Sequence, residues 1–377
     1  MGTTAVDVVI VGGGVIGLSV AWEAASAGMS VSVIDPRPGH GATWAAAGML
    51  APVGEAAFGE ETLTALNIQA AQAWPGFAEA LEAAAGRTIG YMTHGTLLVA
   101  VDTSDRAVTD DLLGYRAQLG FTAAPLTSRE CRALEPLLAP GIRGGADLVG
   151  DHQVDNRRLV DALVAACRAG RVELVEDEVS AVEAGAGRAL GVTLRHGGRR
   201  PAGAVVVAAG CHSGRLGGIP ALMLPPVRPV KGLTLRLRAP DDAPVLRRTV
   251  RGLVHGRNCY LVPRADRTVV IGATVEERGF DLAVLAGAVS DLLDDARRLV
   301  PSLEEYELAD TTTGLRPGSP DNGPIVGPTG LPGLLVATGH YRNGILLAPV
   351  TAAEVVRLLR ADGRGGAEGP FARFGPD

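Results

Sequence analysis

The segment from Val8 to Asp35, VVIVGGGVIGLSVAWEAASAGMSVSVID, constrains the fold more than any other part of this 377-residue chain. It contains an apolar run, a glycine-rich turn that opens a helical pattern, and a second apolar run that ends in an acid. Gly12, Gly14 and Gly17 satisfy the spacing G-x-G-x-x-G. This order predicts a strand, a helix and a parallel strand, with a dinucleotide site at the turn.

Each glycine of the turn has its own physical role. Gly12 allows the tight turn, Gly14 lets a pyrophosphate approach the backbone, and Gly17 lets the helix pack close to the strand. The helix then begins at Val15 and Ile16, where free N–H groups and the positive end of the helix dipole favour phosphate. The turn is therefore expected to hold the phosphates of a dinucleotide.

Asp35 ends the second apolar run, eighteen residues after Gly17. A carboxylate at this place accepts hydrogen bonds from an unphosphorylated adenosine ribose, whereas it repels a 2′-phosphate. The acid therefore disfavours NADP, but this unit alone does not distinguish FAD from NAD.

Length and charge narrow the class of protein. A chain of 377 residues favours two domains, and 47% hydrophobic residues can supply a substantial core. The net charge of −6, without a dense basic run, gives no support for a nucleic-acid partner. The sequence contains no run of eighteen or more apolar residues, so no membrane span is predicted. The segment Met1–Asp7 carries no positive side-chain charge, which argues against a signal peptide.

The cysteines point to a reducing compartment. All four are widely separated and none forms a C-x-x-C pair: Cys131, Cys167, Cys211 and Cys259. We therefore expect a cytoplasmic protein with free thiols, without a disulfide framework and without a metal site.

The pattern of apolar runs predicts two interleaved domains. Residues 1–85, 146–220 and 310–377 are expected to form a nucleotide-binding α/β domain, and residues 86–145 and 221–309 a second domain. In the second, CYLVP and TVVIGATVE alternate and predict a hairpin of an antiparallel sheet, hence an α+β domain. Within the first, Pro75-Gly76 predicts two helical pieces or a kink between Glu61 and Ala85.

A second glycine-containing strand-to-helix unit, GLLVATGHYRNGILLAP, lies at residues 333–349. Its helix is expected to start near Asn343, and the amides of Gly344 to Leu346 favour an anion. A reduced flavin carries negative charge at N1 and C2=O, so such a helix stabilises it. Ala209-Gly210, after the run VVVAAG, is another place where backbone can meet a phosphate.

The sequence resembles the FAD-dependent amine and amino-acid oxidases of the D-amino-acid oxidase, sarcosine oxidase and glycine oxidase group. Within this group it resembles most the glycine oxidases of thiamine biosynthesis. The resemblance covers essentially the whole chain. Its motifs are the N-terminal glycine unit, AAAGML at 45–50, VVVAAG at 205–210, GLRPGSPDNGPIVG at 314–327 and GHYRNGILLAP at 339–349. The last two are the more specific. The resemblance implies a Rossmann-like FAD-binding domain interleaved with a substrate domain built on an antiparallel sheet.

The resemblance also implies residue roles. Arg316 resembles the arginine that holds the substrate carboxylate, Tyr260 the tyrosine that hydrogen-bonds it, and Arg342 a further pocket residue. A planar guanidinium can indeed bind a carboxylate through two parallel bonds. The alternatives from the residues alone are a surface ion pair for Arg316, a core aromatic role for Tyr260, and loop positioning for Arg342.

The cofactor residues follow from the glycine units and from the resemblance together. The residues expected to contact FAD are Gly12, Gly14, Val15, Ile16, Gly17, Asp35, Ala45, Ala46, Ala47, Gly48, Met49, Val179, Ala209, Gly210, Arg342, Asn343, Gly344, Ile345 and Leu346. GLRPGSPDNGPIVG contains no cysteine, so covalent flavin attachment of the sarcosine oxidase type is disfavoured and noncovalent FAD is expected. His212, His255 and His340 are expected to be structural, and Cys259 an inert buried thiol.

The function implied is oxidation of glycine and other small amines or amino acids to the imine, then glyoxylate and ammonia, with O2 reduced to H2O2. Transfer of the imine to thiazole synthesis is a further expectation. Two alternatives stay open: a D-amino-acid or sarcosine-type oxidase or dehydrogenase, and a non-catalytic flavin-binding subunit. The expected partners are a small amino acid and O2, and a homo-oligomer is compatible with the sequence without being defined by it.

Overall fold

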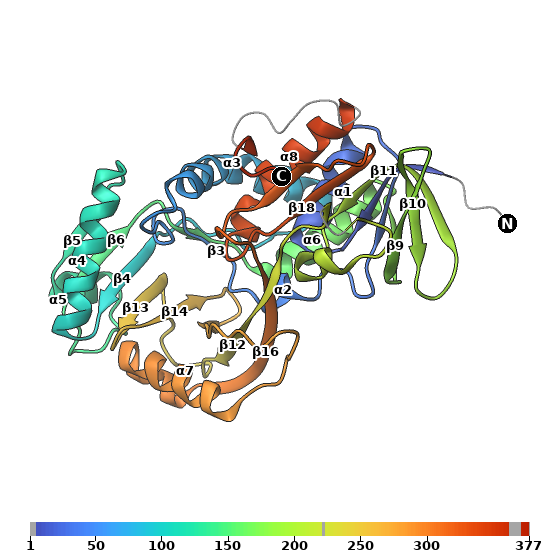
Figure 1. Ribbon diagram of the computed structural model, residues 1–377. Coiled ribbons are helices and arrows are strands. Elements are labelled where there is room, and N and C mark those ends of the chain that lie inside the picture. The colour runs from blue at the N-terminus through green and yellow to red at the C-terminus, as the bar shows by residue number, and fades with distance from the viewer. Residues whose placement is uncertain (1–4, 221–222, 362–370, 377) are drawn as a thin grey trace.

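The computed structural model describes residues 5–220, 223–361 and 371–376. Its described strands form two eight-stranded sheets and one two-stranded sheet. Figure 1 shows the first large sheet with its helices beside the N-terminus, and the second sheet at the opposite end of the molecule. No helix in these ranges is both long and apolar enough to cross a membrane.

The first sheet is built on buried apolar runs. Its order is β17-β18-β11-β1-β2-β8, and β18, β11, β1, β2 and β8 are parallel neighbours. Both faces are covered, which is why these strands lack polar alternation. The strands are β1 (Val6–Val11), β2 (Val31–Ile34), β8 (Glu173–Val175), β11 (Arg199–Val207), β17 (Ile325–Pro328) and β18 (Leu334–Thr338), with an antiparallel extension from β11 by β10 (Arg188–Leu194) and β9 (Val179–Gly185).

Helices cover one face of this sheet and the antiparallel extension covers the other. Val8 and Ile10 of β1 share a core cluster with the helices, whereas Val9 and Val11 pack toward β9 and β10. The helices of that core cluster are α1 (Val15–Ser26), α3 (Glu61–Ala85), α6 (Asn156–Ala169) and α8 (Gly344–Arg360). The predicted strand, helix and parallel strand from residue 8 to 35 are therefore confirmed.

Helix α3 is one element, although Pro75 lies inside it. The prediction of two helical pieces is wrong. Trp74 is fully buried and its Nε1 donates to the carbonyl of Leu346 in α8 at 2.8 Å. Packing of Trp74 and Phe77 against the core offsets the backbone hydrogen bond that the proline removes.

The second sheet is mainly antiparallel and has the order β16-β12-β15-β14-β13-β4-β6-β5. The predicted hairpin is confirmed, because β14 pairs antiparallel with β15. The strands are β4 (Thr96–Ala100), β5 (Ala124–Leu126), β6 (Gly145–Leu148), β12 (Arg228–Arg238), β13 (Thr249–Val254), β14 (Arg257–Pro263), β15 (Thr268–Gly272) and β16 (Glu307–Gly318).

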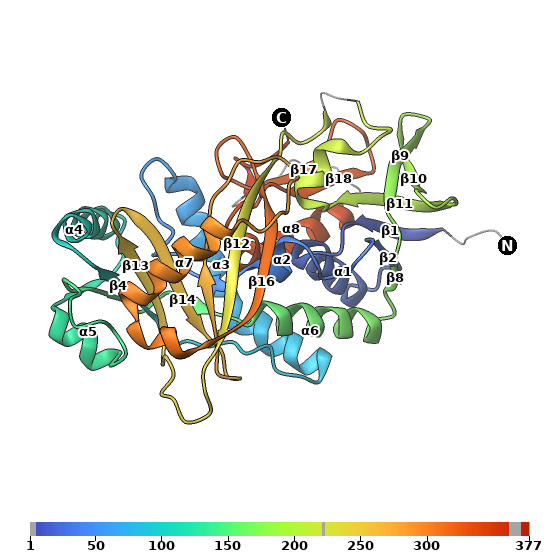
Figure 2. The ribbon, with the colours of Figure 1, turned by 90° about the horizontal axis from the view of Figure 1, so that it is seen from below.

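Alternation along β12 gives this sheet two different faces. Leu233, Leu235 and Leu237 belong to the core cluster under α7 (Ala286–Leu299), whereas Thr234 and Arg236 bond to residues of the first domain. Figure 2 shows β12 and β16 between α7 on one side and α1 and α6 on the other. The polar face of the second sheet therefore meets the first domain.

Shorter elements connect the two sheets. They are α2 (Ala42–Ala45), β3 (Met49–Leu50), α4 (Thr103–Gln118), α5 (Ser128–Leu134), β7 (His152–Gln153), and the 3₁₀ helices η1 (Gly210–Arg215) and η3 (Pro301–Glu305).

Two of the expected domain boundaries fall inside strands of the second sheet. β6 includes residue 146, and β16 runs through residue 310 while pairing with β12. β16 is an unbroken extended segment of twelve residues that reaches the first domain at its far end, where Gly318 bridges to His340. No turn marks the crossing between the domains, so composition could not place it.

Candidate active site

The first glycine turn is sterically restricted to glycine at two of its three positions. Gly12 has φ 107°, and a Cβ there would lie 2.4 Å from the carbonyl oxygen of Ala208. A Cβ on Gly17 would lie 1.9 Å from the carbonyl oxygen of Gly12. Gly14 differs, since only Thr43 Oγ1 lies within 4 Å of its virtual Cβ, at 3.6 Å. Gly14 thus leaves room over the N-terminus of α1. The N-cap residue gives no side-chain bond, and the amide of Val15 donates to Thr43 Oγ1 at 3.1 Å.

Asp35 lies directly after β2 and faces the same turn. Its carboxylate accepts hydrogen bonds from the amides of Gly13 and Arg37, both at 2.7 Å. A carboxylate has about four lone-pair sites, so two such bonds fix its position and leave acceptors for a ribose.

The carboxyl ends of β1, β11 and β18 meet at one edge of the first sheet because these strands are parallel neighbours. Thr338, at the end of β18, donates from Oγ1 to the carbonyl of Gly210 at 3.0 Å. Ala209 lies against the virtual Cβ of Gly12. Val179 belongs to the core cluster that contains Val11 and the end of β2. This edge therefore gathers three separate parts of the chain.

Helix α8 follows β18, so its N-terminus is the second helix N-terminus at this edge of the first sheet. Its N-cap is Asn343, as the sequence predicts, and it also lacks a side-chain cap. The side chains of Ile345 and Leu346 are buried at 7% and 1% exposure, so the first turn has only its backbone to offer a ligand. Two helix N-termini, those of α1 and α8, favour negative charge here.

The small-residue segment Ala45–Met49 lies between the two domains. Ala47 packs with Val262 and Val270 of the second sheet, and Met49 pairs with Gln153. A Cβ on Gly314 would lie 2.6 Å from the Cβ of Ala45. The segment is thus held closely against β14, β15 and β16.

Arg316 and Tyr260 lie on the face of the second sheet that meets the first domain. Arg316 is on β16 and Tyr260 on β14, with β12 and β15 between them. Both large side chains extend over glycines of those intervening strands. A Cβ on Gly232 would lie 2.4 Å from Arg316 Nη2, and a Cβ on Gly272 would lie 2.4 Å from the Tyr260 hydroxyl. The two glycines therefore let both side chains lie flat along the sheet, directed toward each other's strands.

The charge of Arg316 is not neutralised within the described ranges. Its Nη1 donates to the carbonyls of Lys231 and Thr274 at 3.3 and 3.1 Å, and no acidic side chain of residues 5–220, 223–361 or 371–376 forms an ion pair with it. Burial raises the pKa of Tyr260, with Arg316 opposing that rise, so the hydroxyl stays protonated at neutral pH. A half-buried guanidinium and a phenol hydroxyl on one face of the sheet are suited to a carboxylate ligand.

Arg342 belongs to a charge network that sequence reasoning missed. Its Nε lies 3.8 Å from Glu55, whose other oxygen accepts from Arg251 Nη1 at 2.7 Å. Burial alone raises the pKa of Glu55, but Arg251, Arg342 and Arg116 outweigh it and lower the pKa to about 2. Arg251 lies opposite Tyr260 in the β13–β14 pairing. The only sequence signal for Arg251 is its place in the alternation of β13.

His340 and His255 have structural surroundings. His340 is buried, its Nε2 lies 3.0 Å from Thr351 Oγ1, and burial lowers its pKa to about 3. His255 lies near Asp102 and Asp105, in an arrangement within reach of one cation, but Asp105 already binds the amides of His255 and Gly256. These acids therefore have a structural explanation. All four cysteines are free and buried.

The sequence model of a family described as "DAO: FAD dependent oxidoreductase" matches residues 7–358. The chain belongs to this family.

This FAD-dependent oxidoreductase is 38% identical over 361 residues to a glycine oxidase of Geobacillus kaustophilus (strain HTA426), across 94% of this chain and 92% of the relative. It is 36% identical over 358 residues to a bifunctional protein ThiO/ThiG of Nostoc sp. (strain PCC 7120), across 94% of this chain but 52% of the relative. The chain thus spans about half the length of that curated relative. The solved structure of glycine oxidase from Geobacillus kaustophilus superposes with a TM-score of 0.90 at 33% identity, over 100% of this chain and 99% of that chain.

The residues of the first sheet fit the cofactor of the family. A turn restricted to glycine at Gly12 and Gly17, an acid after β2 and the N-termini of α1 and α8 meet at one edge. That donor set suits a pyrophosphate and a flavin anion. FAD is therefore the cofactor of this oxidoreductase.

Proposed function

We propose that this protein oxidises glycine, and with lower preference other small amines and amino acids, using noncovalent FAD and O2. The observation that carries the proposal is Arg316, a guanidinium without an acidic partner among the described residues, on the same sheet face as the Tyr260 hydroxyl. The identity to glycine oxidases across nearly the full chain supports the same substrate.

In the proposed complex the substrate carboxylate binds Arg316 and the Tyr260 hydroxyl. These bonds fix the position of the α-carbon and its amine, which converts binding energy into orientation. Arg342, held on its other side by Glu55, borders the same space and limits the size of the substrate. We keep the expected residues as the proposed FAD contacts: Gly12, Gly14–Gly17, Asp35, Ala45–Met49, Val179, Ala209-Gly210 and Arg342–Leu346.

FAD, when bound, supplies the acceptor for the hydride of the substrate C–H bond and returns the electrons to O2 as H2O2. No general base is assigned, because a neutral amine needs none. The imine hydrolyses in water, so the balanced reaction is glycine plus O2 plus H2O to glyoxylate plus ammonia plus H2O2.

The setting of the reaction is also part of the proposal. Buried free thiols support a reducing, cytoplasmic location. Relatives named ThiO/ThiG support delivery of the imine to thiamine thiazole synthesis. We assign cofactor binding to the domain of the first sheet and substrate binding to that of the second.

A substrate panel tests the proposal. Purified holoprotein is mixed with glycine, sarcosine, D-alanine or D-proline without oxygen, and flavin absorbance is followed; oxygen is then admitted and H2O2 is measured. Glycine should bleach the flavin and release stoichiometric peroxide. Preference for D-alanine, D-proline or sarcosine would replace the substrate assignment, bleaching without peroxide would indicate a dehydrogenase, and no bleaching would indicate a flavin-binding subunit.

A further inference from the structure

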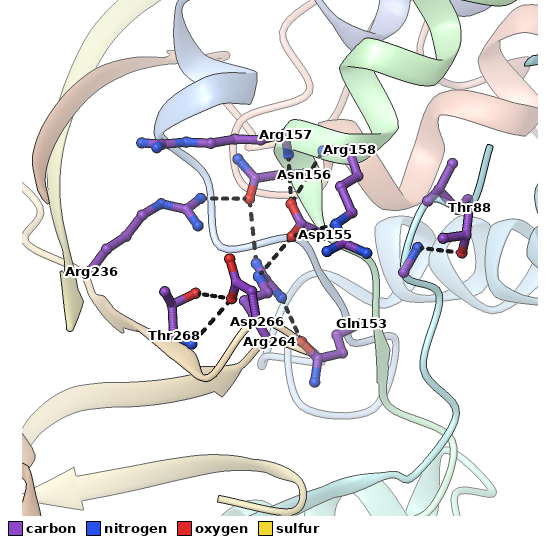
Figure 3. Close-up of polar contacts among 12 residues, drawn as sticks. Thr88, Gln153, Asp155, Asn156, Arg157, Arg158, Arg236, Arg264, Asp266 and Thr268 are labelled. Atoms are coloured by element: carbon purple, nitrogen blue, oxygen red, sulfur yellow. Dashed lines mark hydrogen bonds and ion pairs between the residues drawn. The ribbon is translucent and has the colours of Figure 1, made fainter. Parts of the chain in front are cut away.

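A polar cluster lies behind the segment from Thr43 to Gly48. Figure 3 shows Arg236 and Arg264 of the second sheet reaching toward Asn156 at the start of α6. Arg236, Arg264 and Asn156 are 8%, 7% and 0% exposed. Burying two arginines is costly unless their guanidinium groups are hydrogen-bonded or paired with acids.

The cluster binds the carbonyls of the segment in front of it. Asn156 Nδ2 donates to the carbonyls of Thr43 and Trp44 at 2.8 and 2.9 Å. Thr234 Oγ1 donates to the carbonyl of Ala45 at 2.9 Å. Arg264 Nη2 donates to the carbonyl of Ala47. The carbonyls of Thr43, Trp44, Ala45 and Ala47 therefore point toward the residues that bind them, and away from the opposite side of the segment.

Arg264 is itself fixed at several points. Its Nη1 donates to Gln153 Oε1 at 2.6 Å, and its Nε lies 3.9 Å from Asp155. Figure 3 shows both contacts converging on one guanidinium. The group that holds the carbonyl of Ala47 therefore has little freedom to move.

The peptide group between Ala47 and Gly48 has a bonded carbonyl and, in the part of the chain that the structure describes, an unbonded N–H. It is not among the cis peptides of the described residues, so its N–H points opposite to its carbonyl. Gly48 is buried, yet its N–H has no hydrogen-bond partner within the described ranges. Gly48 also cannot carry a side chain, since its φ is 71° and a Cβ would lie 2.0 Å from the carbonyl oxygen of Val154. A buried free N–H at a position restricted to glycine points to a ligand.

We propose that Arg264 is a positioning residue for the cofactor: by holding the carbonyl of Ala47 it presents the N–H of Gly48 to the FAD ring. A cationic donor on the carbonyl polarises the peptide and makes its N–H a stronger donor. Such a donor stabilises the negative charge that a flavin gains on reduction. Arg264 thus acts on the cofactor through the backbone, without touching it. The proposal rests on FAD binding and is independent of which amine is the substrate.

Arg236 offers a matched control. Arg236, on β12, is as buried as Arg264 and donates to Asn156 Oδ1 at 3.0 Å, but it bonds to no carbonyl of residues 43–48 among the described contacts. Loss of either arginine removes a buried charge from the cluster. Only loss of Arg264 releases the carbonyl of Ala47.

The test compares R264Q and R236Q without any substrate. The apoproteins are titrated with FAD, with protein fluorescence as the signal, and each holoprotein is equilibrated with a reference dye of known potential. R264Q should raise the dissociation constant for FAD at least fivefold and shift the dye equilibrium at least fivefold toward oxidised flavin. R236Q should leave both within twofold, even where its melting temperature falls. Equal shifts in the two variants, or none in R264Q, would overturn the proposal.

A second pair covers the case in which R264Q does not fold. Lysine keeps the charge but lacks the planar guanidinium that donates both to Gln153 and to the carbonyl of Ala47. R264K should therefore raise the dissociation constant for FAD at least threefold relative to R236K. Indistinguishable dissociation constants and dye equilibria in R264K and R236K would reject the positioning role.

Discussion

The guanidinium of Arg316 lies over Gly232, at a distance where a Cβ on Gly232 would be 2.4 Å from Nη2 and 2.5 Å from Nη1. The glycine belongs to β12 and the arginine to the neighbouring strand β16. The absence of a side chain at Gly232 on one strand therefore makes room for the guanidinium that we propose binds the substrate carboxylate, which comes from the next strand.

Replacing Arg316 by alanine should weaken substrate use without releasing FAD. A charge-assisted hydrogen bond contributes about 1.5–3 kcal/mol, so kcat/KM for glycine should fall at least about tenfold, mainly through KM. The measurement is steady-state peroxide release, with flavin content from the absorbance spectrum. R316K keeps the charge without the forked guanidinium, so its kcat/KM for glycine should lie between the values of the wild type and R316A. Unchanged glycine kinetics in R316A would remove Arg316 from the substrate site.

Gly232→Ala should displace Arg316 while leaving the fold intact. The far end of an arginine can swing aside, so the free energy of unfolding should change by less than about 1 kcal/mol. KM for glycine should nevertheless rise several-fold, because the guanidinium loses its place. The control is Gly287→Ala in α7, where a Cβ meets nothing within 4 Å. Identical KM values for G232A and G287A would contradict the role of the glycine seat.

His340 should make stability depend on pH. Burial lowers its pKa to about 3 from an ordinary 6.5, so between these values the unfolded chain binds a proton that the folded protein does not. The free energy of unfolding therefore decreases as the pH falls below 6.5, by about 1.4 kcal/mol per pH unit from this group. Its contribution is complete above pH 6.5.

The measurement for His340 is denaturant unfolding between pH 5 and pH 8 of the wild type and of H340Q. The difference in unfolding free energy between the two proteins should change by about 2 kcal/mol over this range. His196, whose side chain is 79% exposed, provides the control H196Q, which should track the wild type. A constant difference between H340Q and the wild type would show that His340 titrates normally when folded.

The cysteines should be inert in the folded protein. Burial raises the pKa of Cys131 and of Cys211 to about 11 and that of Cys167 to about 12, and it also raises the pKa of Cys259. Thiolate is the reactive form, so a disulfide reagent at pH 8 should modify none of them within minutes and all four in denaturant. Rapid modification of Cys259, next to Tyr260, would reveal an opening of β14.

Sequence patterns predicted most of the first domain because its signals are local. The spacing of Gly12, Gly14 and Gly17 and the acid Asp35 lie within one strand, helix and strand, so the chain itself specifies their proximity. The N-cap at Asn343 was predictable for the same reason. At Pro75 the sequence left two helical pieces or a kink open, and contacts of Trp74 with distant residues keep α3 as one helix.

The contacts that hold the candidate site residues in place were not predictable from local sequence patterns. Glu55 joins Arg251 and Arg342 from three distant segments, and Arg264 reaches the carbonyl of Ala47 across 217 positions. Such contacts depend on how the two sheets meet, which no local pattern encodes. Arg316 and Tyr260 entered through resemblance, and the structure adds the glycines beneath them as a physical reason for their placement.

The parallel pairing of β11 with β18, and the packing of α8 beside α1 against the same sheet, determine when the cofactor site can form during synthesis. The ribosome makes the glycine turn first, but α8, whose first residues we propose to contact FAD, is not complete until residue 360 has been translated. Until then β11 lacks its neighbour β18, and the proposed contacts Asn343–Leu346 are absent. On the proposed contacts, FAD capture is therefore a late event in the folding of this chain, and we expect loss of residues 334–360 to abolish cofactor binding even though the glycine fingerprint remains intact.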